Sequence, residues 1–222
     1  MPSDLRTKAI VLRRTNYGES DRILNLITPE GKLAVLARGV RKEKSRLAGG
    51  IELFSVADVV VHQGRSSLGT LTGAKMLHFY GNIINDLSKL EFASTCLKKI
   101  ERASEHTENP DFFSLLHQVF AGLHGGLADE LISIWFTLNL AHASGEEINL
   151  LCDTTGTKLQ PDQRYSWDPL EAALRLDSNG AISATEIKLA RLMLTNKLQV
   201  VSNVSQASEI SRPLLAIAQA FA

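Results

Sequence analysis

The sequence is poor in cysteine and in long apolar runs. It has 222 residues and only 2 cysteines, Cys96 and Cys152. Two cysteines cannot form a disulfide framework, and no apolar segment precedes the first strand-like run. The longest apolar stretch, around residues 131–140, is interrupted by polar residues and is too short to span a bilayer. We therefore expect a cytoplasmic protein with reduced thiols.

The sequence also lacks the patterns that support catalysis. Gly122, Gly125 and Gly126 end a helical pattern, whereas a phosphate-binding loop precedes a helix. The six histidines are not at metal-ligand spacing, since His117 and His124 would lie two turns apart on one helix. We therefore expect no catalytic residues and no enzyme activity.

Net charge is zero over the whole chain, but it is not evenly distributed. Residues 1–80 hold 13 Lys and Arg against 7 Asp and Glu, and the remaining residues hold 11 against 17. A basic first third and an acidic remainder indicate different partners for the two parts.

The first third has the pattern of short strands. Apolar runs at residues 8–14, 22–28, 32–40, 51–62 and 68–80 are separated by Gly, Asn, Asp and Pro, with no helical period among them. Five short strands in about eighty residues favour a small closed or nearly closed β-barrel. We place a domain boundary at about residue 80.

Residues 81–222 have a helical pattern with one interruption. Apolar residues at three- and four-residue spacing predict helices from 82, over 109–124 and over 127–144. Ser183 and Glu186 form a capping box for a helix to about Asn196, and a last short helix opens at Ser211. Residues 149–180 have turn signals without a sustained period, which indicates a small irregular insert. The fold class is therefore α+β.

A dense group of cations follows the third strand. Residues 38–46, here called the basic loop, contain five cations and one acid, Glu43. Cations spaced along a groove neutralise phosphates and release counterions, which supplies most of the affinity for nucleic acid. The candidate DNA-binding residues of the barrel are Arg13, Arg14, Arg22, Lys32, Arg38, Arg41, Lys42, Lys44 and Arg46.

Two alternatives stay open for this group. The basic loop is also typical of a solvated surface without a partner, and a barrel of this kind can dock a protein instead of DNA. Aromatic residues for base stacking are few. We expect Phe54, Phe79 and Tyr80 to lie in the core, and Tyr17, which is in a turn, is more typical of a packing residue.

The motifs of the first third resemble one family. Tyr17-Gly18-Glu19-Ser20-Asp21-Arg22, then Gly31-Lys32, then Ala37-Arg38-Gly39-Val40-Arg41-Lys42 resemble the RecO family of bacterial DNA repair and recombination mediator proteins. The resemblance implies an OB-fold DNA-binding domain (residues 1–80) and an α-helical domain (residues 81–222). It also implies binding of single- and double-stranded DNA, annealing of complementary strands, a nucleoid-associated location, and action with RecR and single-strand-binding protein to load RecA. Only Arg22, Lys32, Arg38, Arg41 and Lys42 occupy motif positions.

The insert departs from that family's pattern. Many members carry a four-cysteine zinc site there, which begins Cys-x-x-Cys-Gly. Here Cys152 and Gly156 remain, but Thr155 stands at the second cysteine position, and no cysteine or histidine follows. A structural zinc site needs four such ligands, so we expect no metal and no cofactor. We expect packing of Tyr165, Trp167 and Leu174 to hold the insert together.

The resemblance also implies a docking site for the acidic, apolar-ended tail of single-strand-binding protein. Such a tail needs an apolar pocket with a basic rim. Two groups of helical cations are candidates for this rim, and the sequence does not decide between them: Lys98, Lys99 and Arg102, or Lys188, Arg191 and Lys197.

Overall fold

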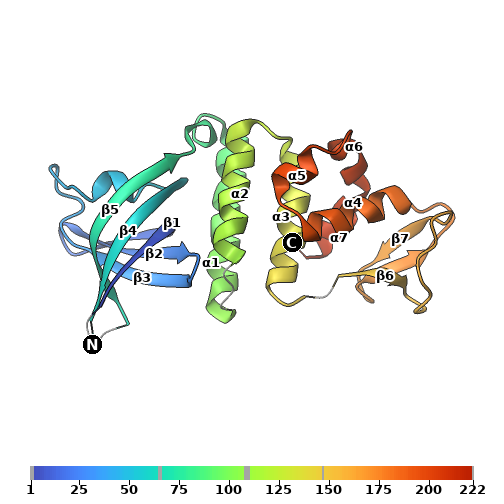
Figure 1. Ribbon diagram of the computed structural model, residues 1–222, viewed down its shortest axis with the longest axis horizontal. Coiled ribbons are helices and arrows are strands. Elements are labelled where there is room, and N and C mark those ends of the chain that lie inside the picture. Colours follow the sequence, from blue (N-terminus) through green and yellow to red (C-terminus); the bar gives the residue numbers. More distant parts are fainter. Residues whose placement is uncertain (1–2, 65–66, 108–110, 147, 222) are drawn as a thin grey trace. The chain divides into compact units, whose positions relative to one another are not determined.

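The computed structural model describes residues 3–64, 67–107, 111–146 and 148–221. The fold is α+β, as the sequence predicts, with five strands first and helices after them (Figure 1). The chain forms two compact units, which divide between His124 and Gly125.

The first unit opens with a closed five-stranded barrel, which is an OB-fold. Its strands are β1 (Ser3–Tyr17), β2 (Asp21–Thr28), β3 (Gly31–Ala37), β4 (Ser55–Gln63) and β5 (Gly69–Phe79). They follow the order β1-β2-β3-β5-β4 around the barrel. Four neighbouring pairs are antiparallel, and a short parallel pairing of Val35 and Leu36 with Gly69 and Thr70 joins β3 to β5. Residues 51–54, which we expected to begin the fourth strand, lie outside it.

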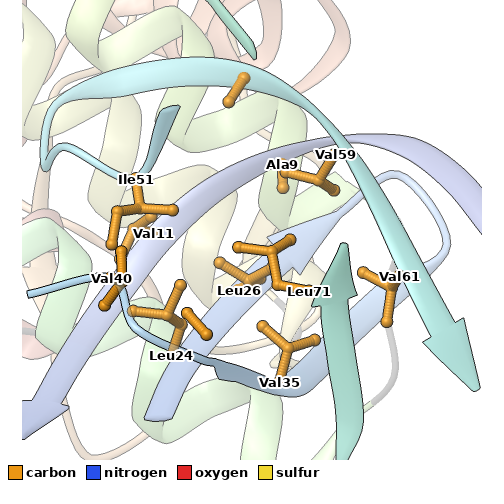
Figure 2. Packing of buried hydrophobic residues seen from close by; sticks show 12 residues of the cluster. Ala9, Val11, Leu24, Leu26, Val35, Val40, Ile51, Val59, Val61 and Leu71 are labelled. Atoms are coloured by element: carbon orange, nitrogen blue, oxygen red, sulfur yellow. The ribbon is translucent and has the colours of Figure 1, made fainter. Parts of the chain in front are cut away.

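Alternating apolar side chains fill the barrel. Leu24 and Leu26 of β2 point inward with 0% and 1% exposure, whereas Ile23 and Asn25, which alternate with them, are half-buried. Figure 2 shows Leu24, Leu26 and Val35 in one cluster with residues of the other strands. Val40 and Ile51 join this cluster from the connection between β3 and β4, so both ends of that connection are anchored in the core.

Two helices complete the first unit. A 3-10 turn, η2 (Gly81–Ile83), leads to α1 (Leu87–His106), where the Asp86 side chain accepts from the Lys89 N–H. This cap starts α1 five residues after the predicted start at 82, because the residues before it form the 3-10 turn. α1 contacts β1, so it belongs to the compact unit of the barrel.

Helix α2 (Asp111–Gly125) also belongs to this unit, as far as His124. The centroid of the Phe120 ring lies 5.6 Å from that of the Phe54 ring and 5.7 Å from that of the Tyr80 ring. Asn82 donates its side-chain N–H to the His124 carbonyl at 2.8 Å. The start proposed at residues 109–110 is outside the described residues. Our boundary at residue 80 marks the end of the barrel, whereas the compact unit continues to His124, because aromatic packing attaches α2 to the barrel's last strand.

The second unit is built on α3 (Asp129–Ala143), whose Trp135 and Phe136 are both 1% exposed. The Trp135 indole N–H donates to the Asn196 carbonyl at the end of α4 (Ala184–Thr195). The predicted capping box of Ser183 and Glu186 is present. The remaining helices are α5 (Leu198–Ser202), α6 (Ala207–Ser211), η3 (Arg212–Leu214) and α7 (Leu215–Ala220). Within the described ranges, no helix is long and apolar enough to cross a membrane.

The insert is more regular than its sequence indicates. Its strands β6 (Asn149–Asp153), β7 (Tyr165–Asp168) and β8 (Ala173–Leu176) form a sheet in the order β6-β8-β7. The strands have only four or five residues, which is too short for a period to be recognised. Tyr165 and Leu174 are buried as expected, and Trp167 is half-buried.

Candidate nucleic-acid interface

The basic loop has a defined frame. Gly39, at φ +62°, donates its N–H to the Asp21 carboxylate at 2.7 Å, and the Arg41 N–H donates to the Ser20 carbonyl at 2.8 Å. Val40 is 3% exposed in the barrel core. The turn between β1 and β2 therefore holds the first half of the loop through hydrogen bonds, and Val40 anchors it by packing.

The second half of the loop is fixed by a short 3-10 helix, η1 (Ala48–Gly50). A Cβ atom on Gly50 would lie 2.6 Å from the Ala74 carbonyl carbon of β5. Only glycine permits this approach of the two backbones. The residues that carry charge therefore project from a connection whose ends are both packed on the barrel.

The cations of the basic loop are exposed. The Arg41 guanidinium donates to the Gly18 carbonyl at 3.4 Å. The other four cations of the loop also have no carboxylate within ion-pair distance in the described part of the chain: Arg38, Lys42, Lys44 and Arg46. These four charges are available to an anion without the loss of an existing ion pair.

The strand cations face a different environment. Arg13 and Asn25 lie opposite each other, and both donate to Glu101 of α1, at 2.9 Å and 2.7 Å. A bulge in β1 between Val11 and Arg13 sets this register. Lys32 of β3 donates to the Glu101 backbone carbonyl at 3.3 Å and lies 3.7 Å from the Glu105 carboxylate. Helix α1 therefore partly neutralises two predicted DNA contacts.

Arg14 and Arg22 are also engaged. The Arg14 guanidinium pairs with the Glu52 carboxylate at 2.9 Å, and its side chain is only 25% exposed. Arg22 donates to the Asn16 side-chain oxygen at 3.2 Å. The structure thus brings the five loop cations together and leaves the other four predicted cations with partners of their own.

Sequence reasoning missed Glu101. This residue is 76 positions from Asn25 in the sequence, and nothing in the local pattern of the helix distinguishes it from its acidic neighbours. Only the docking of α1 on the barrel identifies its role.

The aromatic residues near the barrel are of two kinds. Phe54 and Tyr80 are buried, at 4% and 3% exposure, and burial raises the pKa of Tyr80 to about 12. Phe79, expected in the core, is 38% exposed at the end of β5. Tyr17 is 55% exposed at the end of β1, so its ring offers a face to solvent.

The two predicted rims line two different hollows. Lys98, Lys99 and Arg102 line a hollow of about 420 Å³ beside Arg13. Lys188 and Arg191 line a hollow of about 200 Å³ with apolar walls from Leu159, Pro161, Ala184 and Ile187. The Arg191 guanidinium also donates to the Leu150 carbonyl. Lys197 precedes α5 and is not part of this lining.

Hydrogen bonds organise the turn that follows Cys152. The Asp153 carboxylate accepts from the Thr155 N–H, the Thr155 hydroxyl and the Thr157 N–H at 2.9, 2.6 and 3.0 Å. These bonds, led by the one from the Thr155 hydroxyl, lower the pKa of Asp153. No group of three His, Cys, Asp or Glu side chains suited to a metal ion occurs within the described ranges.

Comparison with known proteins gives consistent matches. The family model described as "Recombination protein O N terminal" matches residues 1–80. A DNA repair protein RecO from Dehalococcoides mccartyi (strain CBDB1) is 36% identical over 167 residues, which cover 74% of this chain and 66% of the relative. The corresponding protein of Halalkalibacterium halodurans is 26% identical over 219 residues, 96% of this chain and 86% of the relative.

The match to a third relative covers most of both chains. The DNA repair protein RecO of Trichodesmium erythraeum is 30% identical over 226 aligned residues, which cover 91% of this chain and 76% of the relative. The similarity therefore includes the barrel and much of the helical part. The chain belongs to the RecO family of DNA repair proteins.

Proposed function

We propose that this protein is a DNA repair and recombination mediator whose barrel binds single- and double-stranded DNA through the phosphate backbone. The observation that carries the proposal is the basic loop, whose five exposed cations project from a frame fixed on the barrel. Family membership supports the repair role. The mechanism is electrostatic and includes no covalent step.

The chemistry of the loop suits phosphates better than base edges. Arginine and lysine neutralise phosphate charge and release condensed counterions, independently of sequence. Two DNA strands repel each other less when cations neutralise their phosphates. Annealing of complementary strands follows from this neutralisation, and the family resemblance supports RecR and the RecA recombinase as further components.

The hollow lined by Lys188 and Arg191, here called the α4 hollow, is the better candidate for the tail of single-strand-binding protein. Its apolar walls fit an apolar terminal side chain, and Lys188 at the rim fits the acidic residues before it. We expect a labelled acidic peptide that ends in phenylalanine to bind the wild type and to bind Lys188→Glu at least about tenfold more weakly. Equal affinity for the two proteins would contradict this assignment.

The DNA-binding proposal is tested by equilibrium binding of a labelled single-stranded oligonucleotide across a salt series. The variant replaces Arg38, Arg41, Lys42 and Lys44 with Glu. Each phosphate contact contributes about 0.7 to the salt slope for single strands, so we expect the slope to fall by about 2.8 and the affinity by roughly 100-fold or more.

A matched variant controls for net charge. Glu replaces four cations away from the loop that have no ion pair among the described residues, Lys89, Lys158, Lys188 and Lys197, and we expect binding closer to the wild type. If the loop variant and this control bind alike, the loop is not the phosphate site. Binding that is insensitive to salt would instead favour the alternative, an adaptor whose barrel docks a protein.

A further inference from the structure

Every residue that lines the hollow beside α1, here called the α1 hollow, carries a polar or charged group. Its lining comes from one residue of β1 and one face of α1, all within the first unit: Arg13, Thr95, Lys98, Lys99, Glu101, Arg102 and Glu105. The hollow has a volume of about 420 Å³ and no apolar residue in its lining, so only the hydrocarbon stems of its long side chains could contact the apolar end of a peptide. This property separates it from the α4 hollow.

The charge of the hollow is positive. Its Glu101 carboxylate is already satisfied by Arg13 and Asn25, and Glu105 lies within reach of Lys32. The other cations of the lining have no ion pair among the residues that the structure describes: Lys98, Lys99 and Arg102. Lys98 and Arg102 are one helical turn apart, so they lie on the same face of α1.

An exposed stripe connects this hollow to the basic loop. Arg13, Thr15 and Tyr17 alternate along β1, so they lie on one face of the strand, and all three are exposed. Four residues of strand span about 13 Å. The stripe ends beside Gly18, whose carbonyl accepts from the Arg41 guanidinium of the loop.

We propose that the α1 hollow is a second phosphate-binding site, and that a single strand held at the basic loop continues over Tyr17 and Arg13 into it. Phosphates need only accessible cations, which the hollow supplies. The exposed Tyr17 ring is a face on which a base can stack. The proposal rests on DNA binding by the loop and adds the α1 hollow as a second contact. It therefore predicts a binding site for single-stranded DNA that is longer than the loop alone would give.

The length of the oligonucleotide separates the two contacts. OB-folds occupy about 4–16 nucleotides. An oligothymidylate of about 4 nucleotides should therefore contact the basic loop alone, and one of about 16 nucleotides should contact both the loop and the α1 hollow. The variant is Lys98→Glu/Arg102→Glu. The control is Lys158→Glu/Lys197→Glu, which makes the same change in net charge at two exposed positions outside the hollow.

We expect the α1 variant to bind the longer oligomer about tenfold more weakly than the control does, with a salt slope lower by about 1.4, which corresponds to two phosphate contacts. The shorter oligomer should bind the α1 variant and the control alike. The neutral variant Lys98→Gln/Arg102→Gln should show a smaller loss in the same direction. Circular dichroism of both α1 variants verifies that α1 remains folded.

Three results would overturn the proposal. The α1 variant and the control could bind the longer oligomer alike, or the variant could lose the shorter oligomer equally. It could also keep oligonucleotide binding and lose an acidic peptide, which would make the hollow a protein dock. If the loop variant loses both oligomers while the α1 variant matches its control, the proposed function stands and only this proposal falls. If the loop variant loses neither oligomer, the proposed function falls.

Discussion

The basic loop and the outer face of the neighbouring strands carry similar numbers of cations but offer them differently. In the loop, Lys42 and Lys44 are exposed and have no ion pair among the described residues. On the strands, Arg13 and Lys32 meet carboxylates of α1. Formal charge in a sequence therefore overstates the charge available to a ligand wherever a helix docks on the strands.

The loop cations and the strand cations differ only in degree in their availability to a ligand. The Arg13 side chain remains 60% exposed in its pair with Glu101, and exposed ion pairs contribute at most about 1 kcal/mol. A phosphate can compete for such a cation at modest cost. The loop cations need no such exchange, but their position depends entirely on the frame that holds the loop.

The largest expected effect comes from breaking that frame. Gly50→Ala would place a Cβ atom 2.6 Å from the Ala74 backbone of β5, and neither backbone can give way without moving η1. Overpacking of this kind costs about 1–3 kcal/mol, which corresponds to a loss of about 2–12 °C in the midpoint of thermal unfolding for a chain of this size. Thermal unfolding followed by circular dichroism measures this loss, and oligonucleotide binding should weaken with it.

The adjacent glycine is the control. Gly49 is exposed, and a Cβ atom there meets nothing within 4 Å. Gly49→Ala should leave the midpoint unchanged or raise it slightly, because alanine restricts the unfolded chain. Similar midpoints for the two variants would show that the contact with Ala74 does not hold the loop.

The sequence predicts the barrel and the main helices because each has its own period. Alternation gives the inward Leu24 and Leu26, and three- and four-residue spacing gives α1 to α3. The basic loop is equally visible, because it is a local run of charge. The insert was harder to predict, since its strands are short and the Asp153 turn depends on hydrogen bonds instead of a hydrophobic pattern.

The pairing of the strand cations could not be predicted from the sequence. Arg13 faces α1 only because of the bulge after Val11, and Glu101 is distant in the chain. Long-range packing also puts α1 and α2 in the barrel's unit. Such contacts depend on how elements dock, which neither composition nor period specifies.

A smaller effect is expected from a substitution that removes the ion pair of one strand cation, so that this cation becomes as available as those of the loop. Glu101→Gln keeps an oxygen for Asn25 and Arg13 but removes the negative charge. Arg13 would then be available for one more phosphate, so we expect a salt slope steeper by about 0.7 and an affinity higher by a few-fold in oligonucleotide titrations. Glu91→Gln, at an exposed position of α1 without an ion pair in the described ranges, makes the same change in net charge. Identical slopes for both variants would mean that Glu101 does not restrain Arg13, and that loop and strand cations differ only in position.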